Sequence, residues 1–278
     1  MEQNTDALAA KHFPPLQKKA VGRLFDSPVF GPVFSRRLGV SLGVNLLPAD
    51  GKVCSFDCIY CECGFNHNFP AHQKLPTREA VRVALNTKLQ EMREQGLAPD
   101  VITFAGNGEP TIHPQFAEII DDTVQLRNAF FPLARISVLS NAVHILNDRV
   151  FEALRRVDNN ILKLDTVSND YIRMVDRPAA KTYDVNAIID KMTAYEGRCI
   201  VQTMFLKGQH EGKDVSNLSE QLVAPWLEAL ERIRPSEVMI YTIDRDTPSP
   251  QLEKASADEL DAIARRVQAL DIPCQVSY

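Results

Sequence analysis

Cys54, Cys58 and Cys61 lie within one short segment of this 278-residue chain, in the spacing C-x3-C-x2-C. Three thiolates on a tight loop can each bind one iron of a cubane and leave the fourth iron without a protein ligand. An open iron of this kind is suited to chelate an amino acid through its amine and its carboxylate. The spacing therefore predicts a [4Fe-4S] cluster with one open, reactive iron.

The elements that must position this loop follow an alternating pattern. Runs rich in Val, Ile and Leu, typical of parallel strands covered on both faces, alternate with amphipathic segments. The expected strands are 38–47, 101–105, 136–140, 161–165, 199–206, 238–243 and 274–277. The expected helices are 77–95, 114–126, 148–157, 184–195, 219–233 and 256–270. Six such repeats predict an α/β fold with a parallel sheet and outer helices, either a flat doubly wound sheet or a partly closed barrel.

Unusual polar residues follow the carboxyl ends of the expected strands, where parallel α/β folds place their sites. Beside the cysteines these are Gly106, Asn107, Gly108, Glu109 and Pro110, then Ser140 and Asn141, Asp165, and Asp244 with Arg245. The glycines would let backbone carbonyls approach an ammonium group, and Glu109 would add negative charge. S-adenosylmethionine offers both the amine and the carboxylate that an open iron can chelate, so it is the predicted occupant of that iron. One-electron reduction would split it into methionine and a 5'-deoxyadenosyl radical that abstracts hydrogen.

Cys63 extends the run to C-x3-C-x2-C-x-C and leaves two alternatives open. As a fourth ligand, it would make the chain an iron–sulfur electron-transfer or structural protein without S-adenosylmethionine chemistry. With zinc, the four thiolates would form a binding module, although zinc sites normally join two separated pairs of ligands. We interpret Cys63 as a spare thiol beside the cluster or a contact to the substrate. Cys199 and Cys274 stand alone in apolar stretches and are expected to be buried.

The triplet of cysteines, with Tyr60 just before the last one and Gly-Asn-Gly-Glu-Pro after the next strand, resembles the radical S-adenosylmethionine (SAM) superfamily. The resemblance implies a partial (β/α)6 barrel, which would decide between the two sheet arrangements. It implies that Tyr60 packs near the adenine and that the glycine turn binds the methionine amine. It also implies that Ser140 and Asn141 form a polar pair that hydrogen-bonds the cofactor.

Residues 30–45, which run into the cysteine loop, resemble a subgroup related to wyosine-type tRNA base synthetases, and the likeness continues to about residue 250. We use this likeness for the fold and not for the substrate. No separate flavodoxin-like domain is evident, so an external electron donor of flavodoxin or ferredoxin type is expected. We divide the chain into an N-terminal arm, 1–30, and a radical SAM core domain, 31–278.

Lys163 and Asp165 are two positions apart on an expected strand, so both side chains point to the same, inward face. Polar residues on a strand that should otherwise be apolar imply a polar barrel interior. These two residues would contact the cofactor or substrate. The alternative is a structural ion pair with a neighbour such as Arg177. Gln202 and Met204 share one face of the fifth strand, and Met204 is expected in the core.

Tyr241, Asp244 and Arg245, near the end of the sixth strand, would close the pocket, unless Asp244 and Arg245 form a surface salt bridge. Arg36-Arg37 would contact an anionic group or lie on the solvated surface. His113, after the glycine turn, is expected at a helix start rather than in catalysis. No catalytic residue is assigned from the sequence.

The composition is that of an ordinary globular chain, with 45% hydrophobic and 24% charged residues. No apolar run approaches the ~20 residues that a membrane helix needs, and the N-terminus carries no signal pattern, so we expect a cytoplasmic protein without membrane contact. The net charge of -5 argues mildly against a nucleic-acid partner. The substrate class stays open among a tRNA base, a peptide or protein side chain, and a small molecule.

Overall fold

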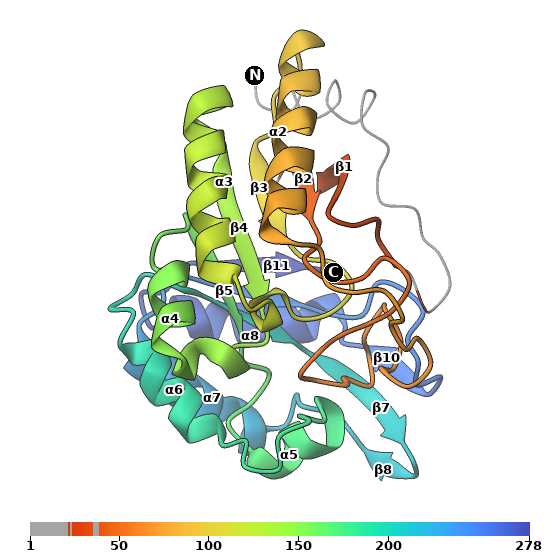
Figure 1. Ribbon diagram of the computed structural model, residues 1–278. Coiled ribbons are helices and arrows are strands. Elements are labelled where there is room, and N and C mark those ends of the chain that lie inside the picture. Colours follow the sequence, from red (N-terminus) through yellow and green to blue (C-terminus); the bar gives the residue numbers. More distant parts are fainter. Residues whose placement is uncertain (1–21, 23, 36–38) are drawn as a thin grey trace.

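The computed structural model describes residues 22, 24–35 and 39–278 (Figure 1). The predictions for Arg36-Arg37 and for most of the N-terminal arm lie outside these residues. The arm's expected boundary at residue 30 falls within the first strand.

A mostly parallel sheet of eight strands forms the centre of the fold, in the order β1-β2-β3-β4-β5-β6-β9-β11. Its strands are β1 (Val29–Ser35), β2 (Gly39–Val44), β3 (Val101–Phe104), β4 (Arg135–Ser140), β5 (Asn159–Lys163), β6 (Ile200–Met204), β9 (Glu237–Tyr241) and β11 (Cys274–Ser277). β1 pairs antiparallel with β2, and the strands from β2 to β11 all pair parallel. The seven expected strands are confirmed, and β1 is an addition at the edge.

The strands of the sheet follow one another in chain order from one edge to the other. A doubly wound sheet would reverse its order at a switch point. The progression in one direction is therefore that of a singly wound, partly closed barrel. This sheet and its covering helices confirm the predicted α/β fold class.

The expected helices are all present in the described part of the chain. They are α2 (Arg78–Glu94), α3 (Phe116–Phe130), α4 (Asp148–Leu154), α6 (Val185–Thr193), α7 (Glu220–Ile233) and α8 (Ala257–Gln268). The Thr77 hydroxyl accepts a hydrogen bond from the amide of Ala80, and Ser256 and Glu259 form a capping box. These caps satisfy amides that have no partner within the first helical turn.

The sequence pattern did not predict α5 (Asn169–Val175) or a small sheet in the order β10-β7-β8. The small sheet contains β7 (Leu206–His210), β8 (Lys213–Asp214) and β10 (Leu252–Lys254). The expected strand 199–206 corresponds to β6 and reaches only the first residue of β7, because Phe205 separates the two strands. Figure 1 shows β7 and β8 extending away from the central sheet.

Two hydrophobic clusters are important for the cysteine loop and the sheet. The larger one lies between the sheet and the helices, and it includes Leu42, Phe104 and Trp226. The smaller one packs Ile59 and Tyr60 of the cysteine loop against residues of α5, β6 and β7. The cysteine loop is therefore part of the core. Within the described residues, no helix combines the length and apolarity needed to cross a membrane.

Candidate active site

The cysteine loop follows β2 and is made of successive tight turns. The amide of Cys61 donates to the carbonyl of Cys58 at 3.2 Å, and the amide of Gly64 donates to that of Cys61 at 2.8 Å. The amide of Phe56 donates to the Cys54 sulfur at 3.4 Å. Cys54, Cys58 and Cys61 are all half-buried free thiols. These turns let three thiols of one short segment face a common region.

Backbone hydrogen bonds hold the loop against the end of α5. The amide of Asp57 donates to the carbonyl of Asp176, and the amide of Ile59 donates to that of Val175, both at 2.9 Å. Ile59 is fully buried. The unpredicted helix α5 is thus the support on which the middle of the cysteine loop rests.

The glycine turn after β3 is joined to the start of the cysteine loop. The amide of Val53 donates to the carbonyl of Asn107 at 2.9 Å, and the amide of Glu109 donates to the carbonyl of Val53 at 3.1 Å. Gly108 has φ +132°, and a Cβ there would lie 1.9 Å from the Val53 oxygen. Only glycine fits at this contact. Gly108 is therefore needed to join the two loops, a role that its sequence position did not reveal.

Gly106 and Asn107 tie the turn to the segment around β2. A Cβ on Gly106, which has φ +152°, would lie 2.5 Å from Oδ1 of Asn45. Asn107 is fully buried, and its Nδ2 donates to the carbonyls of Phe25 at 2.9 Å and Pro48 at 2.7 Å. Its Oδ1 accepts from the amide of Phe25 at 2.7 Å. The Asn107 side chain is thus fully engaged in holding the turn in place.

Glu109 brings the glycine turn and the end of β4 together. Its carboxylate accepts hydrogen bonds from the amide and hydroxyl of Thr111, from the Ser140 hydroxyl at 2.9 Å and from the Asn141 amide at 2.6 Å. Burial raises the pKa of Glu109, and these donors oppose that rise. Asn141 Nδ2 in turn donates to the Ser55 hydroxyl at 2.9 Å and lies 3.7 Å from the Cys54 sulfur. Three predicted site residues therefore form one network that reaches a cysteine.

A buried group of charges lies on the other side of the cysteine loop. The Tyr60 hydroxyl donates to Asp165, and lies 3.2 Å from Asp176. The Lys163 ammonium is 2.5 Å from Asp165 and 3.2 Å from Asp176, and it lies 4.5 Å from the centre of the Tyr60 ring. The structural ion pair, which was the alternative to a cofactor or substrate contact, is therefore formed by Lys163 with Asp165 and Asp176. The prediction of Arg177 as a partner in this ion pair was wrong, because the Arg177 guanidinium lies 3.8 Å from the Asp57 carboxylate.

The electrostatics of this group follow from burial and from opposite charges. Burial raises the pKa of Asp176 to about 7, although the nearby Lys163 ammonium lowers it. Burial alone would lower the pKa of Lys163, but the carboxylates of Asp165 and Asp176 hold it well above its usual value. Asp165 also accepts from the amide of Met204 at 2.9 Å. Tyr60 and Asp165, both predicted at the site, are thus held rigidly.

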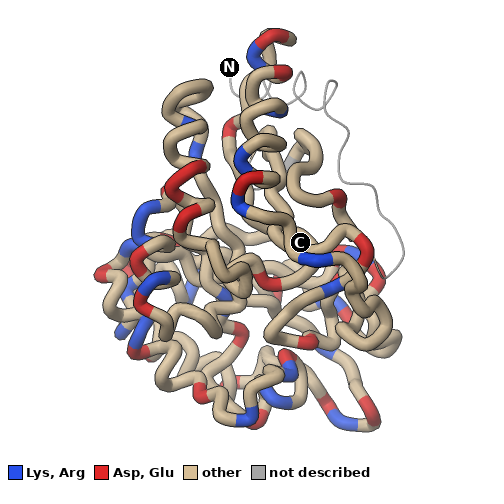
Figure 2. Tube along the Cα trace, viewed as in Figure 1, with Lys and Arg blue, Asp and Glu red and all other residues tan. Residues whose placement is uncertain are grey.

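Lys52 is, like Asp176, a site residue that the sequence analysis missed. Its ammonium donates to the carbonyl of Gly64 at 2.6 Å and lies 3.5 Å from Asp57, and its side chain is only 1% exposed. Burial alone would lower the pKa of Lys52, but the charges of the three cysteines and of Asp57 outweigh burial and raise it. The available signal was a lysine two positions before the first cysteine. Other charges lie interspersed along the outer helices α2, α3 and α4 (Figure 2).

The thiols of the loop differ in their readiness to ionise. Burial raises the pKa of Cys54 to about 12 and that of Cys58 well above its usual value. A hydrogen bond with Cys63, together with the charge of Lys52, lowers the pKa of Cys61 to about 6. Cys63 is buried, and its sulfur lies 3.5 Å from the carbonyl of Gly106.

The donor set fits an iron–sulfur cluster. In the described part of the chain, no group of three or more His, Cys, Asp or Glu side chains converges on a single metal-ion position. A cubane spreads its ligands over different irons, so its cysteines need not converge on one point. Thiolates are also the soft ligands that such clusters take. The glycine turn and the Asn141 amide supply close polar groups around the loop.

The remaining predicted residues have varied surroundings. Met204 is buried in the smaller cluster, as expected, and Gln202 and Tyr241 are half-buried. The alternative of a surface salt bridge between Asp244 and Arg245 was wrong. Asp244 lies 3.6 Å from Lys254, and Arg245 pairs with Glu62 of the cysteine loop.

Two other expectations concern residues outside the loop. His113 is buried, with Nε2 2.8 Å from the Pro76 carbonyl, and its Nδ1 accepts from the amide of Gln115 just before α3. This geometry supports the helix-start role. Cys199 is buried as expected, whereas Cys274 is only half-buried.

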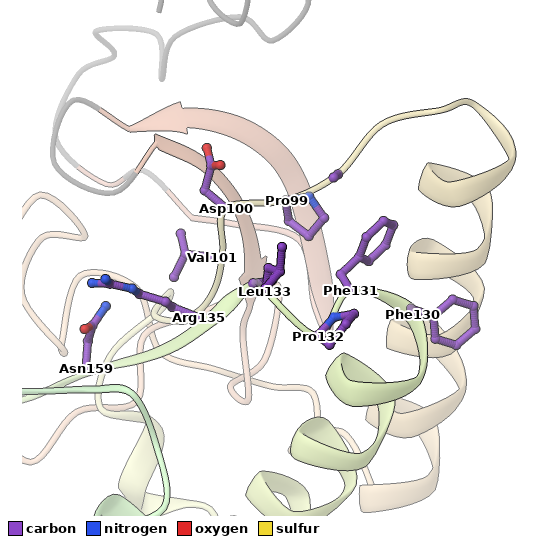
Figure 3. Close-up of a pocket in the computed structure, with 11 residues that line it drawn as sticks. Pro99, Asp100, Val101, Phe130, Phe131, Pro132, Leu133, Arg135 and Asn159 are labelled. Atoms are coloured by element: carbon purple, nitrogen blue, oxygen red, sulfur yellow. The ribbon is translucent and has the colours of Figure 1, made fainter. Parts of the chain in front are cut away.

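A hollow of about 650 Å³ lies at the opposite, amino end of the strands (Figure 3). Its lining includes Phe130 at the end of α3, Phe131 and Pro132 just after it, and Val101 and Arg135 at the starts of β3 and β4. The predicted cysteine, glycine-turn and Ser140–Asn141 residues do not line it.

Comparisons with known proteins agree with this geometry. A family model described as the Radical SAM superfamily matches residues 50–222. A UPF0026 protein of Helicobacter pylori (strain J99) is 32% identical over 236 residues, which cover 84% of this chain and 71% of that protein.

Two solved structures resemble the fold. A radical SAM methyltransferase from Sphaerobacter thermophilus has a TM-score of 0.64 and 17% identity, over 100% of this chain and 82% of that one. TYW1 with a lysine-pyruvate adduct bound has a TM-score of 0.57 and 16% identity, over 82% of this chain and 73% of that one. At these identities the two structures support the fold alone.

Proposed function

Because this chain belongs to the radical SAM superfamily, whose enzymes bind a [4Fe-4S] cluster and S-adenosylmethionine, we propose that Cys54, Cys58 and Cys61 hold the cluster. The observation that carries this proposal is the joining of the cysteine loop to the glycine turn through the two backbone hydrogen bonds of Val53. It supports the proposal because the segment with the three cysteines then lies beside the turn that we assign to the methionine group of the cofactor. The protein is accordingly an enzyme.

When bound, the cluster and cofactor would supply radical chemistry through one-electron cleavage of S-adenosylmethionine. The residues of this chain hold the reacting groups in position. Asp165 and Asp176 orient Tyr60, which we assign to the adenine. Asn141 orients the sulfur of Cys54.

The glycine turn is assigned to the methionine amine. Gly106 and Gly108 lack side chains, so the backbone there can approach a ligand closely. Asn107 fixes the turn from behind through Phe25 and Pro48, and Glu109 fixes it to Ser140 and Asn141. In this assignment the side chains act mainly by holding the backbone in place, and the backbone contacts the cofactor.

The radical would abstract hydrogen from a substrate at the carboxyl end of the barrel. Its class stays open among a tRNA base, a protein side chain and a small molecule, and comparing modified nucleosides, peptides and metabolites in cells with and without the gene would identify it. We assign the electron supply to an external carrier of flavodoxin or ferredoxin type. We place the enzyme in the cytoplasm, where thiols such as these six stay reduced.

Anaerobic reconstitution with iron and sulfide tests the proposed function. The wild-type protein should form one cubane cluster and, with dithionite and S-adenosylmethionine, release 5'-deoxyadenosine. Cys63→Ala should leave the cluster spectrum unchanged. A fully formed cluster that neither binds nor cleaves the cofactor would refute the proposal, and a changed spectrum in Cys63→Ala would favour a four-thiolate electron carrier.

A further inference from the structure

The Lys52 ammonium is buried beside the cysteine loop and connects its two ends. Lys52 precedes the first cysteine, and Gly64, whose carbonyl accepts from the ammonium at 2.6 Å, follows the last. A buried charge is costly unless opposite charges and hydrogen bonds surround it. The geometry therefore requires negative charge on the loop to balance Lys52.

Asp57 alone does not account for this balance. Its carboxylate lies 3.5 Å from Lys52, but it also accepts from the amide of Asn66 at 2.7 Å and faces Arg177 at 3.8 Å. Asp57 is thus shared between two cations. Lys52 lies two positions before the first of the three cysteines, and Gly64, which its ammonium contacts, lies three positions after the third. The cysteine sulfurs of this loop, once deprotonated as ligands, are therefore the other source of negative charge.

We propose that Lys52 is the counter-charge of the cysteine loop, which closes the loop through Gly64 and raises the reduction potential of the cluster. The inference rests on the proposed function, because it takes the three cysteines as ligands. Reduction adds one electron to the cluster, and a fixed positive charge in a poorly hydrated site stabilises the more negative form. Lys52 touches the loop rather than the substrate, so it acts as a positioning residue. Its compact ammonium provides several donors at one point.

Lys52→Met tests the charge, because methionine has a similar length and no ammonium. The measurement is an equilibrium reductive titration of the reconstituted protein without S-adenosylmethionine, followed by the paramagnetic signal of the reduced cluster. At a fixed potential the ratio of reduced to oxidised cluster should fall about tenfold, which equals about 59 mV for a one-electron couple. Lys52→Arg should restore most of the wild-type ratio.

Two controls separate this effect from a general loss of structure. Lys74→Met, at an exposed position after the same loop, should leave the titration unchanged. Iron and sulfide content and the melting temperature of the metal-free protein are measured for each variant. A purely structural role of Lys52 would lower the melting temperature and leave the potential unaltered. Full cluster content in Lys52→Met with a wild-type potential would overturn the inference.

If Lys52→Met does not hold a cluster, Asp57→Asn tests whether the charge balance at Lys52 sets the reduction potential of the cluster. Asparagine keeps an oxygen for the Asn66 amide but removes the negative charge beside the ammonium. The reduced fraction at a fixed potential should then rise, and an unchanged fraction would overturn the inference. A wild-type protein that forms no cluster or no 5'-deoxyadenosine would instead refute the proposed function itself.

Discussion

The two ends of the parallel strands differ in chemistry more than in shape. The amino end contains a hollow of about 650 Å³ lined by Phe130, Phe131 and Pro132, with Leu133 95% exposed at its edge (Figure 3). The carboxyl end contains three thiols and a group of buried charges formed by Lys163, Asp165 and Asp176. The site that we propose therefore rests on the reactive groups at the carboxyl end and not on the concave surface at the amino end.

Connection length explains the difference. The helix-to-strand connections at the amino end are short, at 95–100 before β3 and 131–134 before β4. The strand-to-helix connection after β2 covers 45–77 and has room for the cysteine loop. In parallel α/β barrels, groups at the carboxyl end serve catalysis and groups at the amino end serve stability. The following substitutions test this contrast.

The largest effect is expected for Cys58→Ser at the carboxyl end. The hydroxyl is a poorer ligand for iron than the thiolate, so cluster content and 5'-deoxyadenosine formation should fall to background. Iron and sulfide analysis and product chromatography measure both. Cys274→Ser, on β11 away from the loop, should keep both at the wild-type level. A cluster of normal content in Cys58→Ser would remove Cys58 from the ligand set.

Gly108→Ala should destabilise the protein by about 4 kcal/mol. The estimate combines the strain of positive φ, about 1–2 kcal/mol, with a forced contact to the Val53 oxygen, about 1–3 kcal/mol. Urea unfolding of the metal-free protein measures it. Gly96→Ala, at φ +69° and with open space around its Cβ, should cost only about 1 kcal/mol, from strain alone. Equal costs would show that the contact between the two loops contributes nothing.

Asp165→Asn should destabilise the metal-free protein by about 3 kcal/mol, because it leaves the buried Lys163 ammonium with one carboxylate in place of two. Urea unfolding provides the value. The matched control is Asp190→Asn, which breaks the exposed pair with Arg232 at 2.6 Å and should change stability far less. If the two variants proved equally stable, the buried charges would not be coupled as their geometry indicates.

Leu133→Ser should have the smallest effect. Since this side chain is 95% exposed, unfolding free energy should change by less than about 0.5 kcal/mol, and cluster content and 5'-deoxyadenosine formation should stay unchanged. A clear loss of product formation in Leu133→Ser would show that the amino-end hollow takes part in the reaction.

The sequence predicted most of the fold because hydrophobic periodicity is a local property. The seven expected strands and six expected helices are present, and the cap at Ser256 forms as its capping box predicts. The short elements were missed for a related reason. Helix α5 and strands β7, β8 and β10 are too short or too exposed for their pattern to stand out. The break at Phe205 was hidden within one apolar run.

The sequence by itself determined the cysteine spacing, the glycine turn and the strand ends on which they lie, because covalent spacing and periodicity need no distant partner. The tertiary structure decided which charges are buried together. Tyr60 and Asp165 are 105 positions apart, and Tyr60 and Asp176 are 116 apart. Lys52 looks like a solvated surface residue until the loop folds over it. Burial and pairing depend on segments that meet only when the barrel forms, so no local pattern could reveal them.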